Sequence, residues 1–258
     1  MILVNHAHYL ENNLGAFRQE LLQLPQISHV SASCDVPGNN LINWGFGAQD
    51  VDESFSLNVN LTDEHYLETM GMELVAGRYF SEEFGHDTGK IILNETALEL
   101  LGYEDPIGKN IFLWAEGDRP LEVIGVVRDY FYESKHRLIR PHALMHHGYM
   151  EWTVPAYISV RVKRTDLEKT IHTLEEGWNR YVASIPFDYE FLDEHYEGIY
   201  HNEKQTRTLL YIFAYRVDIR WWIFLVAGVM AFIIAMATVS FHALKASRQN
   251  PGVSLRYE

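Results

Sequence analysis

The chain has 258 residues, of which 47% are hydrophobic and 22% charged, a composition typical of a globular protein with one or two cores. With 35 acidic and 21 basic side chains its net charge is −14, so its surface repels phosphate backbones and we expect no nucleic-acid partner. The single cysteine, Cys34, excludes an internal disulfide, and its strand-like surroundings favour a core residue over a nucleophile.

The first forty residues predict a β-α-β unit. Residues 1–5 and 27–36 are runs typical of strands. Between them, apolar residues recur at helical spacing before Pro25, namely Leu10, Leu14, Phe17, Leu21 and Leu24. The following stretch, 35–50, is rich in Pro, Gly and Asn and therefore predicts a loop or a crossing between domains.

The middle of the chain mixes strands with short helices. Thr62 is expected to cap a helix that runs through Met70, with Gly71 just past its end. Asn94 is expected to cap a second helix over 95–101, again followed by a glycine, Gly102. Gly108 marks a further turn. Strands are predicted at 54–61, 90–93, 110–114 and 121–127.

The last third of the soluble part repeats the opening pattern. A strand over 156–163 is followed by Thr165–Glu168, a capping box that opens an amphipathic helix. Another strand, 189–192, leads to Asp193, which is expected to cap a long helix. The soluble part therefore ends as a second β-α-β unit.

These units predict an α+β fold with a discontinuous domain. Residues 1–51 and 153–192 would pair into one split α/β layer, and residues 52–152 would form an inserted α+β subdomain. The long helix, 193–215, would be a stalk leading to the bilayer.

Residues 221–241 carry no charge and predict a transmembrane helix. At about 1.5 Å per residue this run covers roughly 30 Å, and Trp221 and Trp222 suit a membrane interface. Basic residues flank both ends almost equally, so the positive-inside rule does not decide its orientation. The apolar run 209–215 is too short to span a membrane. The first thirteen residues lack the pattern of a signal peptide.

No motif for catalysis, cofactor or metal binding is found in the sequence, so we expect no enzyme, no cofactor and no metal site. His6 and His8 would share one face of a strand, and His146 and His147 would point opposite ways, but none of the thirteen histidines has zinc-site spacing. The aromatic, glycine-rich segment of the predicted loop is instead a candidate contact surface, formed by Asn43, Trp44, Gly45, Phe46 and Gly47.

Several segments, in order, resemble bacterial FtsX/MacB-type ABC transporter permeases, in particular members from Bacteroidetes. They are ETMGMELVAGRYF (68–80), IILNETALELLG (91–102), DPIGK (105–109) and VIGVVRDYFYES (123–134). The ending, with the apolar span and KASRQNPGVSLR (245–256), is similar to the last helix and tail of such permeases.

This resemblance implies a porter-like split subdomain with an inserted subdomain, in agreement with the organisation predicted above. It also implies an ATP-binding cassette ATPase and a second permease copy as partners, in a lipid bilayer. The large domain would lie in the periplasm, the helix in the inner membrane and the tail, 242–258, in the cytoplasm. No residue of the chain would be catalytic, because the chemistry belongs to the ATPase.

Departures from the family pattern matter as well. Such permeases have four membrane helices, whereas here one span and the short run 209–215 are found, which we interpret as an internal deletion that leaves a chain not transport-competent alone. The alternative is a membrane-anchored extracytoplasmic binding or adaptor module that uses residues 43–47. A tail-anchored enzyme is the third hypothesis, and no converging titratable set in the sequence favours it.

Overall fold

A computed structural model describes residues 1–39, 41–48, 51–114, 119–132, 138–150, 152–163, 166–198 and 221–247. The chain divides into two compact units, residues 1–203 and 204–258, which are described separately here. Thr165, residues 199–215 of the predicted stalk and the tail beyond residue 247 lie outside the described residues. The predicted division of the first unit into a split and an inserted subdomain stays a prediction.

The described residues of the first unit form eleven strands and several short helices. The strands are β1 (Ile2–Val4), β2 (Ile27–Ser33), β3 (Ile42–Ala48), β4 (Val51–Thr62), β5 (Leu74–Gly77), β6 (Lys90–Asn94), β7 (Asn110–Leu113), β8 (Pro120–Val127), β9 (His142–His146), β10 (Tyr157–Val162) and β11 (Tyr189–Phe191). The α-helices are α1 (Leu14–Leu22), α2 (Tyr66–Met70), α3 (Glu95–Leu101) and α4 (Leu167–Tyr181), and the 3-10 helices are η1 (Ala7–Asn13), η2 (Glu82–Asp87) and η4 (His147–Tyr149). Residues 192–198 are also helical.

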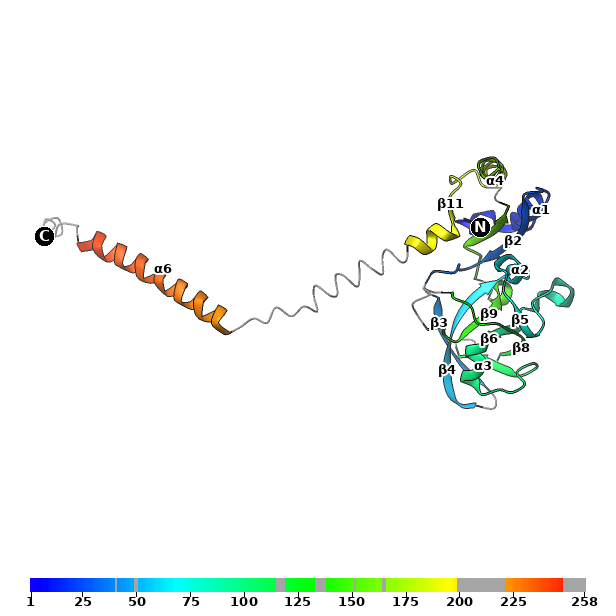
Figure 1. Cartoon of the computed structure of the whole chain (residues 1–258), viewed down its shortest axis with the longest axis horizontal. Coiled ribbons are helices and arrows are strands. Elements are labelled where there is room, and N and C mark those ends of the chain that lie inside the picture. Colours follow the sequence, from blue (N-terminus) through cyan, green and yellow to red (C-terminus); the bar gives the residue numbers. More distant parts are fainter. Residues whose placement is uncertain are drawn as a thin grey trace, which may run out of the picture. The chain divides into compact units, whose positions relative to one another are not determined.

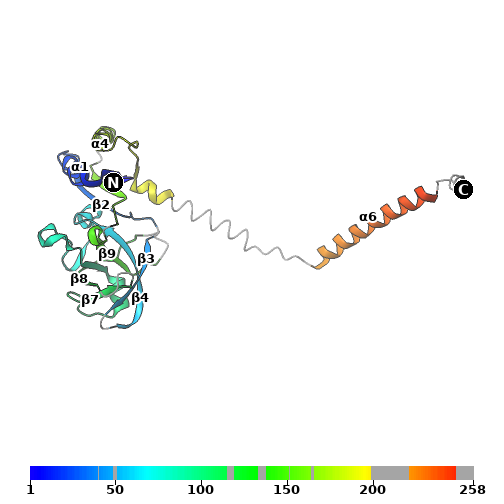
Figure 2. The ribbon, with the colours of Figure 1, turned by 180° about the vertical axis from the view of Figure 1, so that it is seen from behind.

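Four strands form an antiparallel layer at one end of this unit, in the order β11-β1-β10-β2. Helices α1 and α4 lie side by side at this end (Figures 1 and 2). Their apolar stripes meet the sheet because Phe17 of α1 and Trp178 of α4 are fully buried in the same core as Ile2 and Val160. The N-terminal and C-terminal parts of the unit thus share one core.

Six of the other strands close on themselves in the order β4-β3-β7-β8-β6-β9, with β9 returning to pair in parallel with β4, and β5 pairs with β8. Alternate residues of β6 and β9 face different cores: Ile91 and Leu93 pack with Met145, whereas Ile92 packs with Leu144. Burial on both faces explains why these strands read as continuous apolar runs. The closed ring meets the layer through one residue pair of β2 and β4, Ser33 and Thr62.

Several local predictions are confirmed. Asn94 caps α3 by accepting a hydrogen bond from the backbone N–H of Ala97 at 3.0 Å, and α3 runs over the predicted residues. Gly71 and Gly102 end α2 and α3 in the left-handed conformation. Gly108 likewise has a positive φ, of 83°.

Two local predictions are wrong. Thr62 is the last residue of β4 and caps no helix, since α2 begins at Tyr66 after a turn made by Asp63. The predicted loop 35–50 contains β3, which is hydrogen-bonded to β4 and β7 on its two edges. Ladder hydrogen bonds on both sides outweigh the low strand propensity of Gly45 and Gly47.

The second unit has one described element, α6 (Trp221–Ser247). Within it, residues 224–245 are long and apolar enough to cross a membrane, and they are exposed in this unit. The helix therefore contains the predicted span 221–241 and continues beyond it.

Candidate functional site

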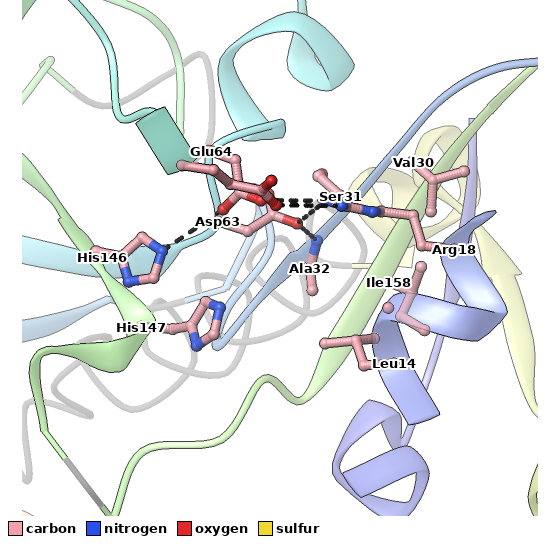
Figure 3. Close-up of a pocket in the computed structure, with 12 residues that line it drawn as sticks. Leu14, Arg18, Val30, Ser31, Ala32, Asp63, Glu64, His146, His147 and Ile158 are labelled. Atoms are coloured by element: carbon pink, nitrogen blue, oxygen red, sulfur yellow. Dashed lines mark hydrogen bonds and ion pairs between the residues drawn. The ribbon is translucent and has the colours of Figure 1, made fainter. Parts of the chain in front are cut away.

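A cavity of about 210 Å³ lies where the antiparallel layer meets the closed ring of strands. Figure 3 shows Leu14 and Arg18 of α1 on one side of it and His146 and His147, at the end of β9, on another. Asp63 and Glu64 follow β4 directly and project between these two sides. The cavity therefore collects charged residues from segments far apart in the sequence.

Asp63 is fixed by backbone hydrogen bonds. Its carboxylate accepts the N–H of Ala32 in β2 at 2.7 Å and the N–H of His65 at 3.1 Å, which turns the chain into α2. The side chain is buried, and this burial raises the pKa of Asp63 to about 7. Asp63 thus joins the closed ring to the layer beside the single Ser33–Thr62 pair.

Glu64 is the centre of the charged cluster. Its Oε1 lies 3.2 Å from His65 Nε2 and 3.3 Å from Arg18 Nη1, and its Oε2 lies 3.5 Å from His146 Nε2. Burial opposes ionisation, but the close contacts with His146 and His65 outweigh it and hold the pKa of Glu64 far below its ordinary value. Contact with Glu64 in turn raises the pKa of His65.

Two further residues complete the cluster. Arg18 Nη2 lies 3.7 Å from Glu82 at the start of η2, and Nη1 lies 4.0 Å from Asp63, so one guanidinium contacts three carboxylates. The His146 ring accepts the Gly148 backbone N–H on Nδ1 at 3.0 Å, which leaves the proton of the neutral ring on Nε2, facing Glu64. The cluster brings carboxylates, imidazoles and a guanidinium together, an arrangement that offers charge pairing and cation binding.

The predicted contact residues lie elsewhere, in β3. Phe46 is fully buried in the core of the closed ring, so it is not available at the surface. Asn43, Trp44 and Gly45 line a separate hollow together with Trp114 and Trp152, and Leu113 and Met150 complete its lining. A Cβ on Gly47 would meet the Trp114 ring at 3.4 Å. The structure thus brings four of the five residues near an exposed tryptophan, and their role in binding stays a prediction.

The histidine pairs differ from expectation. His6 precedes η1 in the left-handed conformation, so His6 and His8 do not alternate on a strand. His146 and His147 stack with ring centroids 4.6 Å apart because the strand ends between them, and they do not point opposite ways. Cys34 is partly buried and donates to the Val154 carbonyl at 3.4 Å, and burial raises its pKa to about 12, in line with a structural thiol.

Sequence reasoning missed the Glu64 cluster because its members are spread over four segments. Arg18, Glu64, Glu82 and His146 are separated by tens of residues, and no spacing rule links them. The one local signal is the run Asp63-Glu64-His65 directly after a strand, and acidic residues there are equally typical of a helix N-terminus.

Comparison with known proteins identifies a family match and structures with a similar fold. Residues 8–176 match the family described as MacB-like periplasmic core domain. The periplasmic region of MacB from Actinobacillus actinomycetemcomitans is similar in structure, with 17% identity and a TM-score of 0.55, over 77% of this chain and 91% of that one.

The extracellular domain of the noncanonic ABC-type transporter YknZ from Gram-positive bacteria gives 17% identity and a TM-score of 0.50, over 68% of this chain and 86% of that one. At such identities the likeness shows the fold alone. No curated protein matches the sequence.

Proposed function

The chain belongs to the family of MacB-like periplasmic core domains of ABC transporter permeases, and from this premise we propose that it couples ATP hydrolysis by a partner ATPase to conformational change outside the cytoplasm. The family match over residues 8–176 is the observation that carries this proposal. The movement itself would serve export or control of a periplasmic partner. In intact relatives a second permease copy would complete the unit.

The connection between the two parts of the first unit supports such a mechanical role. The layer and the closed ring are connected by the Ser33–Thr62 pair with the backbone hydrogen bonds beside it, by the hydrogen bond from Ala32 to the Asp63 carboxylate and by the ion pair of Arg18 with Glu64. A narrow connection made of directional contacts transmits rotation of one part to the other and limits its range. The chain would therefore act without a catalytic residue of its own.

Helix α6 supports an inner-membrane location for this periplasmic domain. The part of the chain that the structure describes contains one helix long and apolar enough to cross a membrane. From the resemblance we extend the proposal: the chain would be an internally shortened permease that is not transport-competent alone, and its tail, 242–258, would be cytoplasmic. The bilayer would be its permanent partner.

The test is whether the full chain assembles with an ATPase. The chain, tagged at its N-terminus, is purified in mild detergent from membranes of its own cell, and bound protein is assayed for vanadate-sensitive ATP hydrolysis. We expect an ATP-binding cassette ATPase to copurify. A variant with the same soluble unit but an unrelated apolar helix in place of 221–247 should retain less ATPase, because the partner contacts the membrane part.

Two results would contradict the proposal. One is a chain that reaches the membrane and purifies folded but carries no ATP hydrolysis above that of an unrelated tagged single-span protein. The other is that the same amount of ATPase protein copurifies with that control protein as with the chain. Either would favour the binding or adaptor module, whose surface would be sought at Asn43, Trp44, Trp114 and Trp152.

A further inference from the structure

The cluster around Glu64 contains a donor set for a metal ion. Glu64, His65 and Glu82 each offer one ligand atom, and these atoms all lie within 4.8 Å of one another. We propose that these three residues bind a divalent transition-metal ion, with Zn²⁺ as the representative ion. One imidazole and two carboxylates with an open further position form a donor set that Zn²⁺ accepts. The proposal goes beyond transport coupling and does not depend on it.

The distance between the ligand atoms of His65 and Glu64 fits a shared ion. With Zn–N of about 2.0–2.1 Å, Zn–O of about 2.0–2.2 Å and tetrahedral angles, two ligand atoms lie about 3.3–3.5 Å apart. His65 Nε2 and Glu64 Oε1 are 3.2 Å apart. His65 Nε2 is shielded from solvent and forms no well-aligned hydrogen bond among the described residues. Little movement of Glu64 or His65 is needed to admit an ion.

His146 acts on this site through Glu64. Because its Nδ1 accepts the Gly148 N–H, its protonated Nε2 points at Glu64 Oε2, 3.5 Å away. A protonated nitrogen is not a metal ligand, but it orients the carboxylate and leaves Oε1 for the ion. His146 is therefore a positioning residue, which is the usual arrangement of a second residue behind a ligating carboxylate.

Arg18 is the competitor of the ion. Its guanidinium lies 3.3 Å from Glu64 Oε1 and 3.7 Å from Glu82 Oε1, so it neutralises the same carboxylates that would hold the metal. Arg18 has to withdraw when an ion binds, because two cations cannot share these oxygens. Glu82 is largely exposed, so its contact with Arg18 lies near the mouth of the cavity and can open toward solvent. Removing the arginine charge should therefore strengthen metal binding.

The experiment is a calorimetric titration of ZnCl₂ into the full chain in detergent at pH 7, purified without a histidine tag and stripped with a chelator. We expect one ion per chain. His65→Gln and Glu82→Gln should each weaken binding by about tenfold or more, since even residues behind the ligands change affinity by that much. Arg18→Gln should tighten it about tenfold through loss of the competing charge.

The matched control is His172→Gln, which removes an exposed histidine of α4 that lies 3.3 Å from Glu176. It should leave the affinity unchanged. X-ray absorption of the Zn²⁺ complex should show one imidazole with oxygen ligands at about 2.0–2.2 Å. The proposal is overturned by the absence of an equimolar site in both wild type and Arg18→Gln. It is also overturned if binding is unaffected by His65→Gln and Glu82→Gln, both of which change exposed or half-exposed side chains and should fold.

Discussion

His142, the first residue of β9, is a buried titratable side chain outside the Glu64 cluster. Its ring Nε2 lies 2.7 Å from the Tyr130 hydroxyl, and burial lowers the pKa of His142 to about 3. The unfolded chain binds a proton at this residue below about pH 6.5, whereas the folded chain does not until about pH 3. The contribution of neutral His142 to the free energy of unfolding is thus complete above pH 6.5 and is lost as the pH falls toward 3.

We therefore expect a pH-dependent difference between wild type and His142→Gln. The excess stability of wild type should fall by about 2 kcal/mol from pH 7 to pH 5, because each pH unit of differential protonation is worth about 1.4 kcal/mol. Thermal unfolding followed by circular dichroism in detergent measures it at each pH. His172→Gln, on an exposed histidine, should show no such trend. A constant difference between wild type and His142→Gln would mean that His142 protonates in the folded state.

At the same scale, residues whose roles are local were predictable and residues that meet across the fold were not. Asn94 caps α3 and Gly71 ends α2 because a cap needs only its own few neighbours. The contact between Glu64 and His146 instead requires the parallel pairing of β4 with β9. That pairing depends on the whole closed ring, so spacing in the sequence carried no sign of it.

Among the elements, β3, β5 and β9 were not predicted. The strand β3 contains Gly45 and Gly47, whose spacing is typical of a turn, yet both glycines lie under the ring of Trp114, from which added Cβ atoms would be 3.5 and 3.4 Å away. The strand β9 is short and contains two histidines. Propensity is a weak guide where packing and ladder hydrogen bonds decide the structure.

The close approach of β5 to β8 makes a prediction at this scale. Gly77 ends β5 with φ of +72°, and a Cβ there would lie 2.1 Å from the carbonyl oxygen of Ile124. Gly102, after α3, has a similar φ of +65° but open space around it. Alanine variants at these two glycines therefore separate the loss of stability caused by backbone strain from the loss caused by a steric clash.

Gly77→Ala should destabilise the first unit by more than about 3 kcal/mol, whereas Gly102→Ala should cost about 1–2 kcal/mol, the strain of a left-handed alanine. The difference arises because β5 must leave β8 to make room for the methyl group. Thermal unfolding of both variants in detergent measures it. Equal losses of stability would show that Gly77 has more space than this structure gives it.

For the whole molecule, the sequence resemblance and the family match agree on a MacB-like periplasmic domain. The resemblance was sufficient because its segments 68–80 and 91–102, in order along the chain, contain β5, most of β6 and the helix α3. The cavity at its junction with the antiparallel layer was not predictable, since it depends on how these two parts meet. The resemblance also implies an orientation of the chain in the membrane, which a direct measurement tests.

The single cysteine allows that measurement. Burial raises the pKa of Cys34 to about 12, so its thiol is poorly reactive and wild type should stay unlabelled by a membrane-impermeant maleimide at pH 7. With Cys34→Ser as background, Glu176→Cys on the exposed side of α4 should be labelled once the outer membrane alone is permeabilised. Ser254→Cys, in the tail, should be labelled only after the inner membrane is broken. The reverse pattern would place the large unit in the cytoplasm, where a periplasmic domain has no access to its partners, and would contradict the proposed transporter topology.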